Sequence, residues 1–175
     1  MARLAWAMTG AGHLLVDCAE VLAGLPAVDL YLSRAAEDVV RMYGLEERLV
    51  PAARRLYRES RARSSAPQVA RFSRGDYDCL VVAPATGNST AKFAWGIADS
   101  LVSNLFAQAG KSRVPIVVLP TDVAPEIDSP GPRGGLVKVF PRPVDLEAVG
   151  RLCSFPGVSV VRTLDELRRV LEVRA

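Results

Sequence analysis

Short apolar runs alternate along the chain with segments of helical periodicity, and this alternation restricts the fold more than any other feature. Four runs contain almost no polar residue, and they cover residues 3–9, 28–33, 79–84 and 114–120. Strands that are apolar on both sides are typical of a parallel sheet with helices on both faces. We therefore predict a doubly wound, Rossmann-like or flavodoxin-like α/β fold, with a single domain over residues 1–175.

The segments between these runs predict helices, because their apolar residues recur every three or four positions. Helices are expected at 13–24, 34–44, 89–110, 145–152 and 164–173. Weaker strands are expected at 135–140 and 158–161. Residues 45–77 are an arginine-rich helix or loop, and the prolines and glycines of residues 121–134 indicate a long irregular loop.

Cysteine usage and hydropathy exclude several classes of protein. Cys18, Cys79 and Cys153 are far apart and form no CxxC pair, so the sequence supports neither an iron–sulfur cluster nor a zinc site. An odd, scattered set of thiols is typical of a cytoplasmic protein. We find no signal peptide and no apolar run of about 18 residues, so we expect a cytoplasmic location and no membrane partner.

The positive charge is concentrated in one block. Between Arg41 and Arg74 there are nine arginines against three glutamates. This arginine-rich block is either a surface for an anionic cofactor or substrate, or a solvated face or subunit contact. We expect no nucleic-acid partner, since no binding motif or aromatic platform accompanies the charge.

The loops that follow the four strands are the places where a doubly wound fold binds ligands. The first of them, Thr9-Gly10-Ala11-Gly12, precedes a helix, so its backbone N–H groups can point at an anion. Leu15 stands where a dinucleotide fingerprint has its third glycine, and an NTPase P-loop is absent. The loop therefore suits a phosphate but argues against tightly held NAD.

Two single residues near this loop have two interpretations each. His13 is the only histidine, so without a GxSxG motif it forms no hydrolase triad, and it has no histidine partner for a metal. It either stabilises a phosphate or flavin edge or is simply a partly exposed residue at a helix start. Ser33 either caps the second helix or contacts an anion, and these roles are compatible.

The hinge after the third strong strand is the most specific feature. It comprises Pro84, Ala85, Thr86, Gly87, Asn88, Ser89 and Thr90. A structural turn needs one or two small or hydroxyl-bearing residues, whereas this hinge consists almost entirely of them. We therefore predict a ligand-facing hinge, followed by a helix with small side chains at Ala91, Ala94, Gly96, Ala98 and Ser100.

The hinge and the helix after it resemble those of the flavoprotein superfamily of homo-oligomeric flavin-containing Cys decarboxylases. The resemblance is carried by PATGNS at 84–89 and by Ala91-Lys92, Gly96-Ile97, Asp99 and Leu101, and it covers about residues 3–120. It implies bound FMN, with the phosphate at the first loop and Ser33 and the flavin ring along the hinge. It also implies a homo-oligomer built from trimers, whose site an adjacent subunit completes.

Two departures distinguish the chain from the decarboxylase branches. No histidine lies between Arg34 and Pro84, and PTDVAPE at 120–126 replaces the P-x-M-N-x-x-M-W clamp. The flavin prenyltransferase branch is disfavoured because its first loop usually reads SGASG rather than TGAGH. The first strand, the hinge and the PTD loop resemble archaeoflavoprotein-like dihydromethanopterin reductases instead. That resemblance implies a pterin substrate and an external electron donor, either NAD(P)H or a redox protein.

The sequence thus predicts an FMN-dependent dihydromethanopterin reductase of one-carbon metabolism. Asn88 is the candidate for contacting flavin and substrate, and Asp122 is either a pterin partner or proton donor or a loop cap. The arginine-rich block is a candidate site for the anionic tail of the pterin. Two alternatives remain: a flavin-binding electron carrier without a substrate of its own, and a decarboxylase that uses unfamiliar residues.

Overall fold

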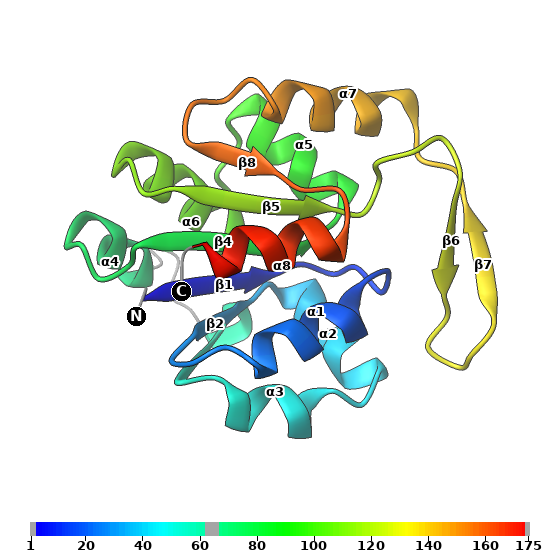
Figure 1. Cartoon of the computed structure of the whole chain (residues 1–175), viewed down its shortest axis with the longest axis horizontal. Coiled ribbons are helices and arrows are strands. Elements are labelled where there is room, and N and C mark those ends of the chain that lie inside the picture. Colours follow the sequence, from blue (N-terminus) through cyan, green and yellow to red (C-terminus); the bar gives the residue numbers. More distant parts are fainter. Residues whose placement is uncertain (1–2, 62–66, 174–175) are drawn as a thin grey trace.

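The computed structural model describes residues 3–61 and 67–173, and a central sheet covered by helices forms its body (Figure 1). Six parallel strands lie in the order β3-β2-β1-β4-β5-β8. Their bounds are β1 Leu4–Met8, β2 Asp29–Leu32, β3 Arg55–Arg58, β4 Cys79–Ala85, β5 Ile116–Pro120 and β8 Val158–Val160. The direction of winding reverses between β1 and β4. This order confirms the doubly wound fold and places its switch point between those two strands.

Helices cover both faces of the sheet. One face carries α1 Leu15–Ala23, α2 Arg34–Met42, α3 Glu46–Ala52 and α8 Leu164–Glu172. The other carries α4 Ala70–Ser73, α5 Gly87–Trp95, α6 Leu101–Lys111 and α7 Pro143–Leu152. Two short 3₁₀ turns, Glu59–Arg61 and Pro67–Val69, connect β3 to α4. Within the described residues, every helix is too short or too polar to cross a membrane.

The strands are apolar on both sides because both sides are buried. In β1, Leu4, Trp6 and Met8 pack toward α1, whereas Ala5 and Ala7 pack toward α5 and α6. All five side chains are buried. The small alanines leave room for helices rich in larger side chains, so β1 forms the centre of a two-layered core.

The prediction of a single helix at 89–110 is wrong, because two helices, α5 and α6, occupy this segment. Gly96 ends α5 with a φ of 72°, a left-handed conformation that glycine adopts without strain. The N–H of Ile97 then donates to the carbonyl of Lys92 at 2.8 Å. Ser100 begins α6 as its N-cap and exchanges hydrogen bonds with Ser103 in a capping box. Gly96, Ala98 and Ser100 therefore lie in the break rather than along one helix face.

The arginine-rich block contains a strand that the sequence pattern did not indicate. β3 forms the edge of the sheet and its side chains are partly exposed, so its sequence RLYR lacks an apolar run. The block also contains α3, the two 3₁₀ turns and α4. Ser64-Ser65-Ala66, part of the turn expected at the end of this block, lies outside the described residues.

An arm replaces the irregular loop expected at 121–134. β6 (Ile127–Pro130) pairs with β7 (Leu136–Val139) as an antiparallel hairpin that projects beside the sheet (Figure 1). The strand expected at 135–140 is therefore present, but within the described chain it pairs with β6 rather than with the main sheet. The hydroxyl of Tyr43 donates to the carbonyl of Pro130 at 2.9 Å and attaches the arm to the end of α2.

Candidate functional site

The loops after β1 and β4 are joined through Thr9. Its hydroxyl donates to the carbonyl of Pro84 at 3.1 Å and accepts from the N–H of Thr86 at 2.8 Å. Its own N–H also donates to the carbonyl of Pro84, at 3.2 Å, and the Ala83–Pro84 peptide is cis. Thr9 is 1% exposed, so it supports the hinge from behind rather than facing a cavity.

The loop after β5 is attached to the same hinge. The N–H of Thr121 donates to the carbonyl of Ala85 at 2.9 Å, and its hydroxyl approaches the same oxygen at 3.3 Å. Thr86 caps α5 by accepting from the N–H of Ser89 at 3.2 Å. The carboxyl ends of β1, β4 and β5 therefore form one connected rim, on which Asp122 lies beside the start of α5.

A cavity of about 360 Å³ opens at this rim near the switch point. We call it the hydroxyl-lined cavity. Its lining residues are Gly10, Ser33, Arg34, Ala35, Glu59, Thr86, Asn88, Ser89, Lys92 and Ser100. The helices α2 and α5 both begin at its wall, so their N-terminal dipoles favour an anion there. Hydroxyls, helix starts and the guanidinium of Arg34 form a donor set that suits a phosphate group, whereas Lys92 is paired with Asp99 at 2.8 Å.

Glycine at position 10 allows the first loop to approach α2 closely. A Cβ built on Gly10 would lie 2.5 Å from the Cβ of Ala35, closer than real side chains approach. A Cβ on Gly12 would collide with the hydroxyl of Tyr43. The GxG sequence is therefore required by packing between this loop and α2, and Gly10 at the same time lines the cavity.

Ser33 confirms its expected role as a helix cap. Its side chain accepts from the N–H of Ala36 at 3.1 Å and begins α2. The same residue lines the hydroxyl-lined cavity, so capping and contact with a ligand are compatible in space.

Glu59 is a cavity residue that sequence reasoning missed. Its carboxylate accepts from the N–H of Arg34 at 2.8 Å and from the N–H of Leu101 at 2.5 Å. It therefore bridges the starts of α2 and α6 and places a negative charge on one wall. An anionic ligand is consequently favoured beside the other lining residues, such as Thr86 and Ser89, rather than beside Glu59.

Arg34, Lys92 and Ser100 are further lining residues that the prediction omitted. Arg34 follows Ser33 directly, and Lys92 lies one helical turn after Asn88. Both could therefore have been predicted as site residues from their spacing in the sequence. Glu59 and Ser100 had no such signal, because only the folded chain brings their segments to the cavity.

Several predicted site residues lie outside this cavity. Pro84 and Ala85 are buried in β4, and Ala11 is 6% exposed. Thr90 is fully buried, and its hydroxyl has no hydrogen-bond partner in the described part of the chain. These residues shape the hinge and the first loop from within.

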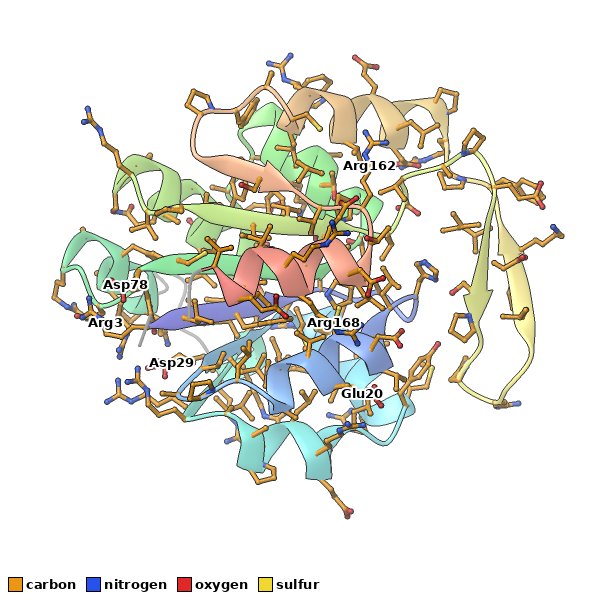
Figure 2. The ribbon with its side chains drawn as sticks, viewed as in Figure 1. Arg3, Glu20, Asp29, Asp78, Arg162 and Arg168 are labelled. Carbon is orange, nitrogen blue, oxygen red and sulfur yellow. The ribbon has the colours of Figure 1, made fainter. Side chains whose placement is uncertain are left out.

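His13 lines a second cavity of about 360 Å³ on the α8 side of the rim. Thr121, Val123 and Arg162 also line it, and Figure 2 places Arg162 near the carboxyl-end edge of the sheet. Burial lowers the pKa of His13, although Asp122 and Asp17 oppose the shift. Burial therefore favours the neutral form of the imidazole.

The arginines of the arginine-rich block lie partly at the amino ends and partly at the carboxyl ends of the strands. Arg54 and Arg71 pair with the buried Asp29 at the start of β2. Figure 2 labels Asp29 at this amino end of the strands. Arg58 pairs with Glu46 at the end of β3. Much of the block's positive charge is thus neutralised within the chain, and only part of the block lies near the cavity.

A cavity suited to an anion, at the switch point of a doubly wound parallel sheet, is typical of proteins that bind a nucleotide-type cofactor. The chain belongs to the Flavoprotein family, whose model matches residues 1–171.

Two relatives carry the name dihydromethanopterin reductase (acceptor). The protein from Methanosarcina mazei is 47% identical over 141 residues, which cover 74% of this chain and 59% of that protein. The protein from Methanocaldococcus jannaschii is 42% identical over 131 residues, which cover 69% of this chain and 53% of that protein. The chain thus spans slightly more than half the length of these two relatives.

A solved structure extends the likeness to almost the whole chain. Burkholderia xenovorans DmrB in complex with FMN, described as a cubic protein cage for redox transfer, superposes with a TM-score of 0.89. It is 39% identical, and the match covers 99% of this chain and 94% of that one.

Proposed function

We propose that this chain is an FMN-dependent reductase that converts dihydromethanopterin to tetrahydromethanopterin by hydride transfer from reduced flavin. One observation carries the proposal: a phosphate-suited cavity lies at the switch point of a chain that is 47% identical over 141 residues to a protein named for this reaction. The electron donor is external, either NAD(P)H or a redox protein. A cytoplasmic location and a single domain belong to the same proposal.

FMN fits the residues that line the hydroxyl-lined cavity. We assign its phosphate to Gly10, Ser33, Thr86 and Ser89, which combine a close backbone approach with three hydroxyls. Arg34 contributes positive charge at the start of α2. Bound FMN supplies two-electron chemistry, and the chain supplies binding and orientation.

Mixing the purified chain with dihydromethanopterin, FMN and a chemical reductant tests the proposal. Loss of the dihydropterin absorbance, dependent on protein and FMN, is the expected result. Because electrons enter and leave through one flavin, initial rates should follow ping-pong kinetics. Failure to bind FMN, or no pterin reduction by the fully loaded chain, would overturn the proposal.

An electron carrier without its own substrate is the second candidate. The observation that favours it is the similarity to Burkholderia xenovorans DmrB, which is 39% identical and is described as a cage for redox transfer. In that case the flavin would exchange electrons with a protein partner while dihydromethanopterin stays unchanged, so the same assay distinguishes the two functions.

Replacing Asn88 by alanine should weaken FMN binding about tenfold, corresponding to about 1.4 kcal/mol for a lost hydrogen bond and its geometry. Asn88 is exposed at the wall of the cavity, and the catalytic role assigned to it requires contact with flavin and substrate. Flavin fluorescence titration measures the affinity, and the reductase assay measures turnover. Gln108→Ala in α6, outside the cavity lining, is the matched control. Unchanged affinity and turnover in Asn88→Ala would refute the assigned role.

The arm is the part of the chain that suits contact with another copy. Leu136, Val137 and Phe140 are 71%, 57% and 66% exposed. A two-stranded hairpin is marginally stable in water unless its apolar side chains are covered. We therefore propose that the arm packs against a neighbouring subunit in a homo-oligomer built from trimers.

The double variant Leu136→Ser, Phe140→Ser should dissociate the assembly into smaller species, because it removes the apolar contact area of the arm. Light scattering coupled to size-exclusion chromatography measures the mass. Val173→Ser at the end of α8, where the side chain is 89% exposed, is the control for loss of a solvated apolar group. An unchanged mass for the double variant would exclude the arm as a necessary contact.

A further inference from the structure

Two carboxylates converge on Gly87 at the start of α5. A Cβ built on Gly87 would collide with Oδ2 of Asp122 and would lie 3.1 Å from Oδ1 of Asp145. Asp122 follows β5, and Asp145 belongs to the first turn of α7, which packs alongside α5 (Figure 1). Residues from three separate elements thus occupy one space beside the hinge.

Asp145 is held in its ionised form. Its carboxylate accepts from the backbone N–H of Arg142 at 2.9 Å and from the guanidinium Nε and Nη2 at 2.9 and 2.8 Å. Its side chain is buried, whereas that of Arg142 is 71% exposed. The Arg142 guanidinium lowers the pKa of Asp145, so Asp145 contributes a fixed negative charge next to the hinge.

The surroundings of Asp122 favour its protonated form, in contrast to those of Asp145. Burial is the main cause that raises the pKa of Asp122, and the charge of Asp145 adds to the effect. The N–H of Gly87, the side chain of Thr121 and His13 oppose the shift without cancelling it. Asp122 is therefore the carboxyl group that holds a proton more readily, as expected for the weaker acid of a coupled pair.

Asp122 is not itself among the lining residues of either cavity, but residues that line each of them lie beside it. Its sequence neighbours Thr121 and Val123 line the second cavity, with His13. The neighbours of Gly87, Thr86 and Asn88, line the hydroxyl-lined cavity. Asp122 thus lies on the rim between the place assigned to the flavin and a cavity open to a second molecule.

We propose that Asp145, held by Arg142, is a positioning residue that makes Asp122 the proton donor for pterin reduction. This inference rests on the proposed function. Reduction of the C=N bond adds a hydride to carbon and a proton to nitrogen. The hydride comes from reduced flavin, which is left oxidised, and the proton comes from Asp122, which is left as the carboxylate. Solvent returns the proton to Asp122, and the external electron donor restores the flavin.

Two variants should change the titration of Asp122 in opposite directions. Asp145→Asn removes the adjacent negative charge and releases the Arg142 guanidinium, so the pKa of Asp122 should fall. Arg142→Gln leaves Asp145 charged but uncompensated, so the pKa of Asp122 should rise. A purely structural role at the start of α7 predicts destabilisation by both variants but no such opposite shifts.

Isotope-edited infrared spectroscopy of the full chain without pterin measures this titration through the protonated carboxyl band. Asp122→Asn identifies the band by its loss. Asp38→Asn is the matched control, since Asp38 also pairs with an arginine three residues away, Arg41, but lies exposed on α2. It should leave the band unchanged. If Asp145→Asn fails to fold, Arg142→Gln alone still gives the sign of the shift.

The reductase assay supplies the second measurement. Asp122→Asn should lower turnover about a hundredfold, the usual contribution of general acid catalysis. Because the donor must be protonated, turnover falls as pH rises through the pKa of Asp122. The pH range over which turnover falls should move to lower pH in Asp145→Asn and to higher pH in Arg142→Gln.

The outcomes separate the inference from the proposed function. An infrared titration of Asp122 that neither variant moves overturns the inference, whatever the chain reduces. Opposite infrared shifts in a chain that reduces no pterin overturn the proposed function, and with it the proton donation, but not the coupling of Asp145 to Asp122. Opposite shifts in both measurements support the inference.

Discussion

Replacing Gly10 by alanine is expected to weaken FMN binding by about ten- to a hundredfold, since overpacking of this kind costs about 1–3 kcal/mol. The new methyl group would lie 2.5 Å from the Cβ of Ala35 and 3.3 Å from its carbonyl carbon. The first loop and the start of α2 must then separate, although both form the wall assigned to the phosphate. Flavin fluorescence titration measures the loss of affinity, and urea unfolding measures the cost in stability.

Gly110→Ala is the matched control for this substitution. Gly110 lies in α6, is exposed, and a Cβ built there meets no atom of the described chain within 4 Å. Alanine in a helix is favoured over glycine by about 0.5–1 kcal/mol, so this variant should be neutral or slightly more stable. An affinity of Gly10→Ala equal to that of Gly110→Ala would contradict the proposed phosphate site.

Replacing Asp29 by asparagine is expected to lower the free energy of unfolding by about 3 kcal/mol, as when one partner of a buried ion pair is removed. Asp29 is fully buried and accepts from Arg54 Nε at 2.8 Å and from the Tyr77 hydroxyl at 2.7 Å. Arg71 also approaches it, at 3.4 Å. Urea unfolding measures the effect. FMN affinity should stay unchanged, because Asp29 lies at the amino ends of the strands (Figure 2), whereas the cavity lies at their carboxyl ends.

Asp78→Asn tests whether burial is the cause. Asp78 pairs with Arg3 at 3.0 Å near the same edge, but the two side chains are 46% and 51% exposed. An exposed pair of this kind contributes less than about 1 kcal/mol. Equal losses of stability in the two variants would contradict the role assigned to burial.

The contribution of Asp29 should also depend on pH. Burial opposes its ionisation, but the hydrogen bonds from Arg54 and Tyr77 and the charges of Arg54 and Arg71 outweigh burial and lower its pKa below 3.8. The stabilisation is therefore fully present above that value and is lost as pH falls through the folded-state pKa. The difference in unfolding free energy between wild type and Asp29→Asn should narrow in the same range.

The fold was predictable because burial on both faces leaves a local pattern. Residues 79–84 and 114–120 are apolar throughout, and each becomes a central strand. β3 was not predictable in this way, because an edge strand keeps its polar side chains partly exposed. The break at Gly96 was missed because the apolar spacing continues across it, whereas a left-handed glycine and the Ser100 cap end one helix and begin the next.

The candidate site was predictable where its residues are adjacent in sequence. The hinge at 84–90 supplies Thr86, Asn88 and Ser89 to one cavity, and Ser33 joins them because it also ends a central strand. Glu59 was not predictable, because its contacts with the N–H groups of Arg34 and Leu101 join residues 25 and 42 positions away.

The sequence by itself predicted the parallel sheet and a ligand-facing hinge at the carboxyl ends of its strands, because strand burial and hinge composition are local properties. The cofactor expected there followed from the resemblance of that hinge to the flavoprotein superfamily. Only the tertiary structure decided which residues meet at those carboxyl ends. Asp145 and Arg142, at the start of α7, lie next to Gly87 and Asp122 in the folded chain. Part of the arginine-rich block lies at the amino ends of the strands instead, where Arg54 pairs with Asp29. Electrostatic coupling depends on distance through space, so the pairing of Asp122 with Asp145, 23 positions apart in the chain, had no signal in the sequence.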